Sequence, residues 1–263
     1  MEIANDPGGS AQAGNVEMVT IASKGNTSDF GTHSNTGENQ NVPMASNEVR
    51  GLLFRGFNSY AGSPADSFAN DDIDYITISS EGNSVDFGTC VQDGFSGAGV
   101  ASRTRAIICG STYYGGSPQA TRANQALEYV TISTTGNGTD FGDFSGSFGN
   151  SGACGNGVRA VIAAGEFGSG DGATLSNSNI MEYVTIASTS NATDFGDLSV
   201  TRKLIDGVGN GTRGIFGGGQ ATGQSNIIDY ITIASTGDAS DFGDLTTARQ
   251  NVGTAGDGHS GIQ

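Results

Sequence analysis

Pairs of aspartates at a fixed spacing are the residues of this chain with the most obvious chemistry. The motif Asp-Phe-Gly-Asp places two carboxylates three positions apart, and oxygen ligands of this kind suit Ca²⁺. The alternative, which we favour, is that the leading Asp caps a turn and pairs with an arginine of a neighbouring unit, because both residues recur once per repeat. The pairs are Asp140 and Asp143, Asp194 and Asp197, and Asp241 and Asp244.

Other reactive side chains do not form a recognisable catalytic set. The two histidines, His33 and His259, lack ligand-type spacing, and no Cys-x-x-Cys pair suggests a zinc site. The run GNGTRG at 209–214 fits the dinucleotide-binding pattern literally, but it precedes a β-type run instead of a helix. We therefore expect no catalytic residues, no enzyme activity, no metal and no cofactor.

The charge balance argues against nucleic-acid binding. The chain has 263 residues, with 27 Asp and Glu against 11 Lys and Arg, and a net charge of -16. Such a surface repels phosphate and anionic lipid. No run approaches the ~20 apolar residues of a membrane span, and the first residues lack the pattern of a secretory signal. The three cysteines, Cys90, Cys109 and Cys154, form no disulfide framework, and we expect Cys109 to be buried.

The segments that position these residues form a sequence repeat. The motif Asp-Phe-Gly recurs every 47 to 57 residues, and an arginine that leads a short apolar run follows each of the first four copies by 19 to 21 residues. Periods near 50 residues without helical patterning indicate propeller blades. The markers are Asp29, Asp86, Asp140, Asp194 and Asp241, with Arg50, Arg105, Arg159 and Arg213.

Each repeat predicts four strands and no helix. In the last complete copy these are 206–211, 213–219, 228–235 and 240–245, with a Gly/Asn-type turn between the third and the fourth. Gly and Ala dominate the first strand, which suits a crowded position next to a central axis. The fold class is therefore all-β, with four-stranded blades.

The two ends of the chain each carry half a repeat. Residues 15–32 read as a third and fourth strand, whereas the C-terminal end reads as a first strand and the start of a second. We expect one five-bladed propeller domain over 1–263, closed by both termini, and the alternative is part of a larger ring. The predicted blade units are about 33–90, 91–144, 145–198, 199–245, and 246–263 combined with 1–32.

Length variation is concentrated between the second and third strands of each repeat. The variable loops, 57–72, 111–126, 166–179 and 220–226, are predicted to lie together on one face. Their Tyr, Ser, Gly and Asn are typical of adaptable recognition loops. Tyr60, Tyr113, Tyr114 and Phe167 mark a candidate face for a glycan or a neighbouring subunit, and the alternative is that they only cover the loops.

The Arg–apolar–Gly-Gly run RGIFGGG, the β-run that ends in a polar turn, and the segment LTTAR together resemble the kelch repeat, although the chain has no Trp. The repeated sequence is similar to repeats in virion structural proteins of marine tailed phages. This resemblance implies a non-enzymatic tail, fibre or capsid-surface component that contacts other virion proteins or copies of itself and serves in host attachment. The alternative is a secreted or cell-surface carbohydrate-binding propeller.

Overall fold

A computed structural model describes residues 2–4, 14–20, 23–33, 38–40, 42–54, 57–59, 68–115, 120–170 and 173–254. All regular secondary structure in these ranges is β-strand. No helix that could cross a membrane occurs among the described residues.

Five antiparallel sheets follow one another along the chain. In the last four, consecutive strands form a meander, and we name their positions the inner, arginine, tyrosine and phenylalanine strands. The second sheet consists of β5 (Met44–Ser46), β6 (Arg50–Phe54), β8 (Phe68–Thr77) and β9 (Val85–Gly94), and the third of β10 (Ala98–Ala101), β11 (Arg105–Cys109), β14 (Ala126–Thr131) and β15 (Thr139–Asp143). The fourth consists of β17 (Gly152–Gly155), β18 (Arg159–Ala163), β21 (Ile180–Thr185) and β22 (Thr193–Asp197), and the fifth of β23 (Asp206–Gly209), β24 (Arg213–Gly217), β25 (Ile227–Thr232) and β26 (Ser240–Asp244).

The first sheet has only three strands. The tyrosine strand β2 (Asn15–Met18) and the phenylalanine strand β3 (Ser28–Thr32) lie where the sequence predicts them. The place of the arginine strand beside β2 is taken by β1 (Glu2–Ala4). The C-terminal residues that the sequence predicts to supply this strand fall within 255–263, which lie outside the described part of the chain, so that expectation stays a prediction.

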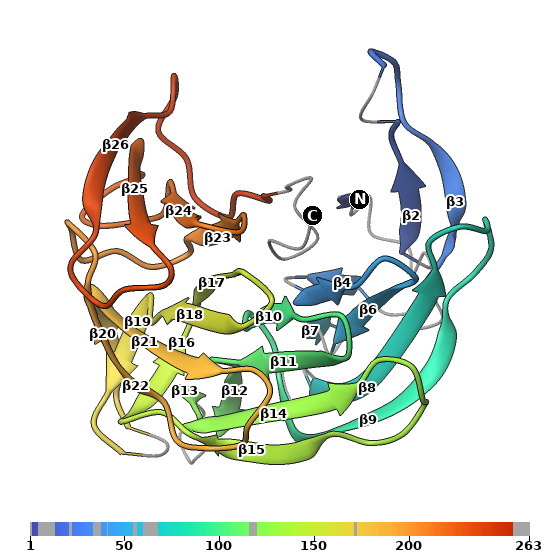
Figure 1. Cartoon of the computed structure of the whole chain (residues 1–263), viewed down its shortest axis with the longest axis horizontal. Coiled ribbons are helices and arrows are strands. Elements are labelled where there is room, and N and C mark those ends of the chain that lie inside the picture. The colour runs from blue at the N-terminus through green and yellow to red at the C-terminus, as the bar shows by residue number, and fades with distance from the viewer. Residues whose placement is uncertain are drawn as a thin grey trace.

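The five sheets are arranged around a common middle (Figure 1). The inner strands β5, β10, β17 and β23 contact one another in that order. In the view of Figure 1 an opening separates the fifth sheet, on the left, from β2 and β3 of the first sheet, on the right. The predicted all-β class and the four-stranded units are confirmed, whereas closure of a five-bladed ring stays a prediction.

The hydrophobic core is divided into four clusters, and each lies between two adjacent sheets. Between the first and second sheets it contains Val16, Phe30, Leu53 and Ile76. Three further clusters fill the second-to-third, third-to-fourth and fourth-to-fifth contacts in the same way. Both faces of the internal sheets are thus apolar, as expected for sheets that are covered on each side.

The variable loops themselves contain short strands. The loop of the third sheet forms a hairpin of β12 (Thr112–Gly115) and β13 (Ala120–Ala123). The connections around the fourth sheet form a small sheet of β16 (Ser147–Gly149), β19 (Glu166–Gly168) and β20 (Ser176–Asn177), and β16 contacts β13. In the second sheet β7 (Phe57–Ser59) pairs with β8 and with β4 (Glu38–Gln40). Because β13 and β16 touch, the inserts of the third and fourth sheets lie side by side.

Candidate functional site

The repeated Asp-Phe-Gly corner joins each sheet to the next one. Its glycine has a positive φ, and a Cβ at Gly88 (φ +147°) would lie 2.5 Å from the carbonyl oxygen of Gly136 in the following sheet. Gly31, Gly142 and Gly196 meet the turns of their following sheets in the same way. The glycine is therefore required both for its backbone conformation and for the close approach of the next turn.

Hydrogen bonds fix this turn against the phenylalanine strand. The backbone N–H of Gly136 donates to the carbonyl of Phe87 at 2.7 Å, and that of Gly138 to Thr89 at 2.7 Å. The Asn137 side chain accepts from the Thr89 N–H at 3.2 Å. Asn83, Asn191 and Asp238 accept from Thr32, Asp143 and Asp197 in the other three contacts. The Gly-Asn turn that recurs in the repeat thus forms the contact between adjacent sheets.

A buried acid in the tyrosine strands of the third, fourth and fifth sheets makes a second connection. Glu128 is 1% exposed and accepts from the backbone N–H groups of Val91, at 2.5 Å, and Gln92, at 2.9 Å, which follow the phenylalanine strand of the preceding sheet. Glu182 accepts from the N–H and the hydroxyl of Ser145. Asp229 does the same with Ser199 and also pairs with buried Arg202 at 3.1 Å.

Sequence reasoning missed these acids. The signal was present, because Glu or Asp opens every copy of the run before Tyr-Val/Ile-Thr-Ile, or Met-Val-Thr-Ile in the first copy.

The repeated arginines connect sheets through carbonyl groups instead of aspartates. Arg105 lies over the Tyr129 ring of its own sheet, 4.5 Å from the centroid, and donates to the carbonyl of Ala187 in the next sheet at 3.0 Å. Arg50 and Arg159 stack on Tyr75 and Tyr183 and donate to Ile132 and Ile233 in the same manner.

The predicted Asp–Arg pairs do not occur among the ion pairs of the described residues. The reason is geometric: the tyrosine face holds each guanidinium at its own sheet, where a carbonyl of the next sheet lies within reach.

The acidic corner remains at the surface. Asp140 and Asp241 accept from the N–H of Gly142, at 3.2 Å, and Gly243, at 3.0 Å, but each of these contacts lies within one strand, β15 or β26, and not in a turn. Burial raises the pKa of Asp197, and the nearby Asp238 and Asp194 carboxylates raise it further. No group of three or more potential metal ligands is found within the described ranges.

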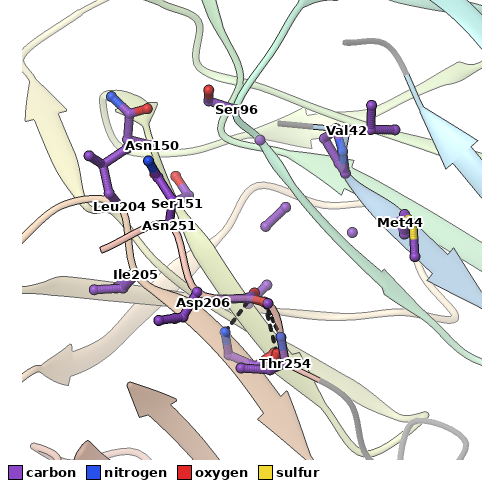
Figure 2. A pocket seen from close by; sticks show the side chains of 18 residues that line it. Val42, Met44, Ser96, Asn150, Ser151, Leu204, Ile205, Asp206, Asn251 and Thr254 are labelled. Atoms are coloured by element: carbon purple, nitrogen blue, oxygen red, sulfur yellow. Dashed lines mark hydrogen bonds between the residues drawn. The ribbon is translucent and has the colours of Figure 1, made fainter. Parts of the chain in front are cut away.

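Two hollows lie along the middle of the molecule, where the inner strands meet. The first has a volume of about 420 Å³ (Figure 2) and the second about 380 Å³, and both are lined by Met44, Gly99, Ala153, Gly207 and Thr254. A Cβ at Gly207 would lie 2.6 Å from the Ala153 carbonyl oxygen, so the predicted crowding of these strands is confirmed.

Polar groups in the first hollow are engaged with the protein itself. The Asp206 carboxylate accepts from the N–H and the hydroxyl of Thr254, each at 2.9 Å (Figure 2), and from the N–H of Gly207 at 2.8 Å. Burial raises the pKa of Asp206, although these hydrogen bonds oppose the shift. In the second hollow, burial raises the pKa of the Cys154 thiol, which keeps it protonated and unreactive near neutral pH.

The predicted recognition residues are only partly described. Tyr60 lies outside the described residues, and Tyr114 is described only through its backbone in β12. Tyr113, also in β12, is half-buried. Phe167 in β19 is half-buried as well and packs edge-on against Phe148, with ring centroids 5.9 Å apart. Phe167 therefore covers the core between the third and fourth sheets, in agreement with the alternative interpretation for this residue.

Comparison with known proteins adds no family. No protein-family model matches the chain, and no curated protein matches it.

Proposed function

We propose that this chain is a non-enzymatic structural and interaction protein, built from kelch-like propeller blades, that serves as a tail, fibre or capsid-surface component of a phage virion. The observation that carries the proposal is that the repeated polar residues are used to join sheets. The asparagines, buried acids and arginines of the repeat bind backbone groups of the neighbouring sheet. A repeat whose polar residues join neighbouring sheets builds a rigid frame.

The inserts between arginine and tyrosine strands provide the surface for partners. They contain the short strands β12–β13 and β19–β20, and β16, from the connection between the third and fourth sheets, pairs with β19 and contacts β13. A rigid frame that carries adjacent hairpins suits protein–protein contacts, and the same surface suits attachment to a host glycan.

The virion assignment is tested by immunogold labelling of phage particles produced from the genome that encodes the chain. Labelling of intact particles at one defined structure is the expected result, and its absence from purified particles would contradict the assignment.

A glycan array separates the alternative of a free carbohydrate-binding module. The purified protein and its Tyr113→Ala and Tyr114→Ala variants would be compared at equal concentration. Glycan binding that both variants retain would move the site away from β12. Glycan binding that either variant loses, together with unlabelled virions, would favour the carbohydrate-binding module.

A further inference from the structure

Within the chain, adjacent sheets meet four times through the same contact, in which the phenylalanine strand of one sheet receives the turn of the next. At the opening between the fifth and first sheets, the two sides of this contact do not meet each other. One half belongs to the fifth sheet. Phe242 in β26 is 51% exposed, whereas its four counterparts, Phe30, Phe87, Phe141 and Phe195, are at most 4% exposed. Gly243 keeps the positive φ of the corner glycine, +137°, but a Cβ there would meet nothing within 4 Å.

The other half belongs to the first sheet. Residues 23–27 form the turn that precedes β3, and they and the first two residues of β3 are all exposed. Thr27 is exposed there, whereas its counterparts Ser84, Gly138, Ala192 and Ala239 are buried or half-buried against a preceding sheet.

Two further connections are unmatched at the same places. The side-chain carboxylate of Glu17, the counterpart of the buried acid Glu128, has no hydrogen-bond partner among the described residues, and neither does the side chain of exposed Thr246, the counterpart of Ser199. Arg213 lies over Tyr230 at 5.0 Å like the other repeated arginines, but no described carbonyl of a following sheet accepts from it. The phenylalanine corner, the turn and the acid connection are therefore each present in halves, whereas residues 21–22, the acceptor positions of the arginine connection, lie outside the described residues.

The two halves are also complementary in charge. The turn of the first sheet contains Lys24, and the edge of β26 contains Asp241 and Asp244. At the contact between the fourth and fifth sheets, by contrast, Asp238 lies close enough to Asp197 to raise its pKa. A lysine on one side and carboxylates on the other favour association of the unmatched halves.

We propose that the β26 edge is a docking site for the 23–27 turn of a second copy of this chain, so that copies associate head to tail. Within one chain the four internal contacts use the same residues, and they leave β26 and the first sheet on opposite sides of the opening (Figure 1). A second copy can bring its turn to β26 without changing any of them. Because the two surfaces differ, the association is heterologous and builds a ring or a filament. The inference rests on the structural role proposed above and names its partner, but its test needs no virion.

Disulfide trapping tests the proposal with two single variants. Asn26→Cys and Asp244→Cys would be purified separately and mixed under mild oxidation. The internal contacts place the side chain at position 191 on the N–H of Asp143 at 3.1 Å, so the corresponding pair 26 and 244 should bond between copies. Cys90, Cys109 and Cys154 are buried, which limits background reaction. The expected result is a covalent heterodimer that forms at least ~10-fold faster than in a mixture of Asn26→Cys and Asp143→Cys, in which position 143 is occupied internally.

Two controls make the outcome decisive. The double variant Asp143→Cys/Asn191→Cys should form a disulfide within one chain and shows that this geometry is competent. If the separate variants give no heterodimer while Asn26→Cys/Asp244→Cys closes within one chain, the turn belongs to the same molecule and the proposal is wrong. If neither disulfide forms, β26 is not a docking site.

A second measurement does not depend on new cysteines. Sedimentation velocity of the unmodified chain should show larger species as its concentration rises, and Phe242→Ser should weaken this self-association at least ~10-fold. A concentration-independent monomer at all loadings would contradict the proposal, whatever the result of the virion labelling.

Discussion

At the scale of single residues, polar side chains of this protein act mainly as acceptors for backbone groups. The buried acids of the tyrosine strands are the clearest example, because Glu128, Glu182 and Asp229 each accept from N–H groups of the segment that follows the preceding sheet. Ionised acceptors form stronger hydrogen bonds than neutral ones, so an acid is better suited to this position than an amide.

Replacement of Glu128 by Gln tests this role. The variant keeps the shape of the side chain but turns one acceptor into a donor that faces the N–H of Val91 or Gln92. We expect the free energy of unfolding to fall by about 2 kcal/mol, measured by urea denaturation. Exposed Glu81→Gln is the control and should change it by less than ~0.5 kcal/mol. Equal midpoints for the two variants would show that the buried acid does not stabilise the contact.

Asp206 predicts a pH dependence of stability. Burial raises its pKa in the folded state above the value of 3.8 expected in the unfolded chain. The folded state therefore holds this proton more tightly, and the resulting stabilisation is complete below pH 3.8 and is lost as the pH rises through the raised pKa.

Asp206→Asn carries no such charge, so its stability relative to the unmodified protein should improve as the pH rises. Denaturation at about pH 3.5, 5 and 7 measures the difference, and a difference independent of pH would contradict the shift.

Some residue roles could be predicted from the sequence and others could not. The sequence predicts that Asp140 accepts a local hydrogen bond, and it accepts one from the N–H of Gly142, although both residues lie in β15 and not in a turn. The predicted aspartate partner of Arg105 was wrong. The spacing of charged residues along a chain does not show that a tyrosine ring and a carbonyl lie closer to the guanidinium than a carboxylate does. Tyr60 and Tyr114 stay predictions as recognition residues.

At the scale of elements, the phenylalanine strand is the part of each sheet that receives its neighbour. Gly88→Ala should distort this contact, because the new Cβ would lie 2.5 Å from the Gly136 carbonyl oxygen, a backbone atom that cannot rotate away. Gly243→Ala is the matched control, since Gly243 occupies the same motif with a similar φ, +137°, and has no neighbour within 4 Å.

Both variants strain the backbone by about 1–2 kcal/mol, and only Gly88→Ala adds a clash of about 2 kcal/mol or more. Thermal or urea denaturation of dilute protein would measure both. Equal destabilisation would mean that the glycine is needed for its conformation alone.

The elements themselves were predictable for a physical reason. Each strand of the fifth sheet lies within or next to its predicted range because β-branched runs alternate with Gly- and Asn-rich turns, and this pattern is local in sequence. The short strands of the variable loops were not predicted, because pairs such as β16 with β19 depend on contacts between segments that carry no repeat. The β1–β2 pair was missed for the same reason, since Glu2–Ala4 has no counterpart in the other copies.

At the scale of the whole molecule, the charge works against the proposed association of copies. Each chain has a net charge of -16, so two copies repel each other within the distance over which salt does not screen their charges. That range, the Debye length, is about 30 Å at 10 mM salt and falls to about 8 Å at 150 mM. The attraction between Lys24 and the carboxylates of β26 acts over a few ångströms and involves one positive charge per contact.

The long-range repulsion should therefore dominate the salt response. We expect larger species in sedimentation velocity at about 150 mM NaCl than at about 10 mM, at equal protein concentration. Lys24→Glu should weaken the association at both salt concentrations, and the second change Asp244→Lys should restore it, because it reverses the same pair. Dissociation by added salt would instead show that the contact is held by surface ion pairs, without the burial of Phe242 that the internal contacts predict.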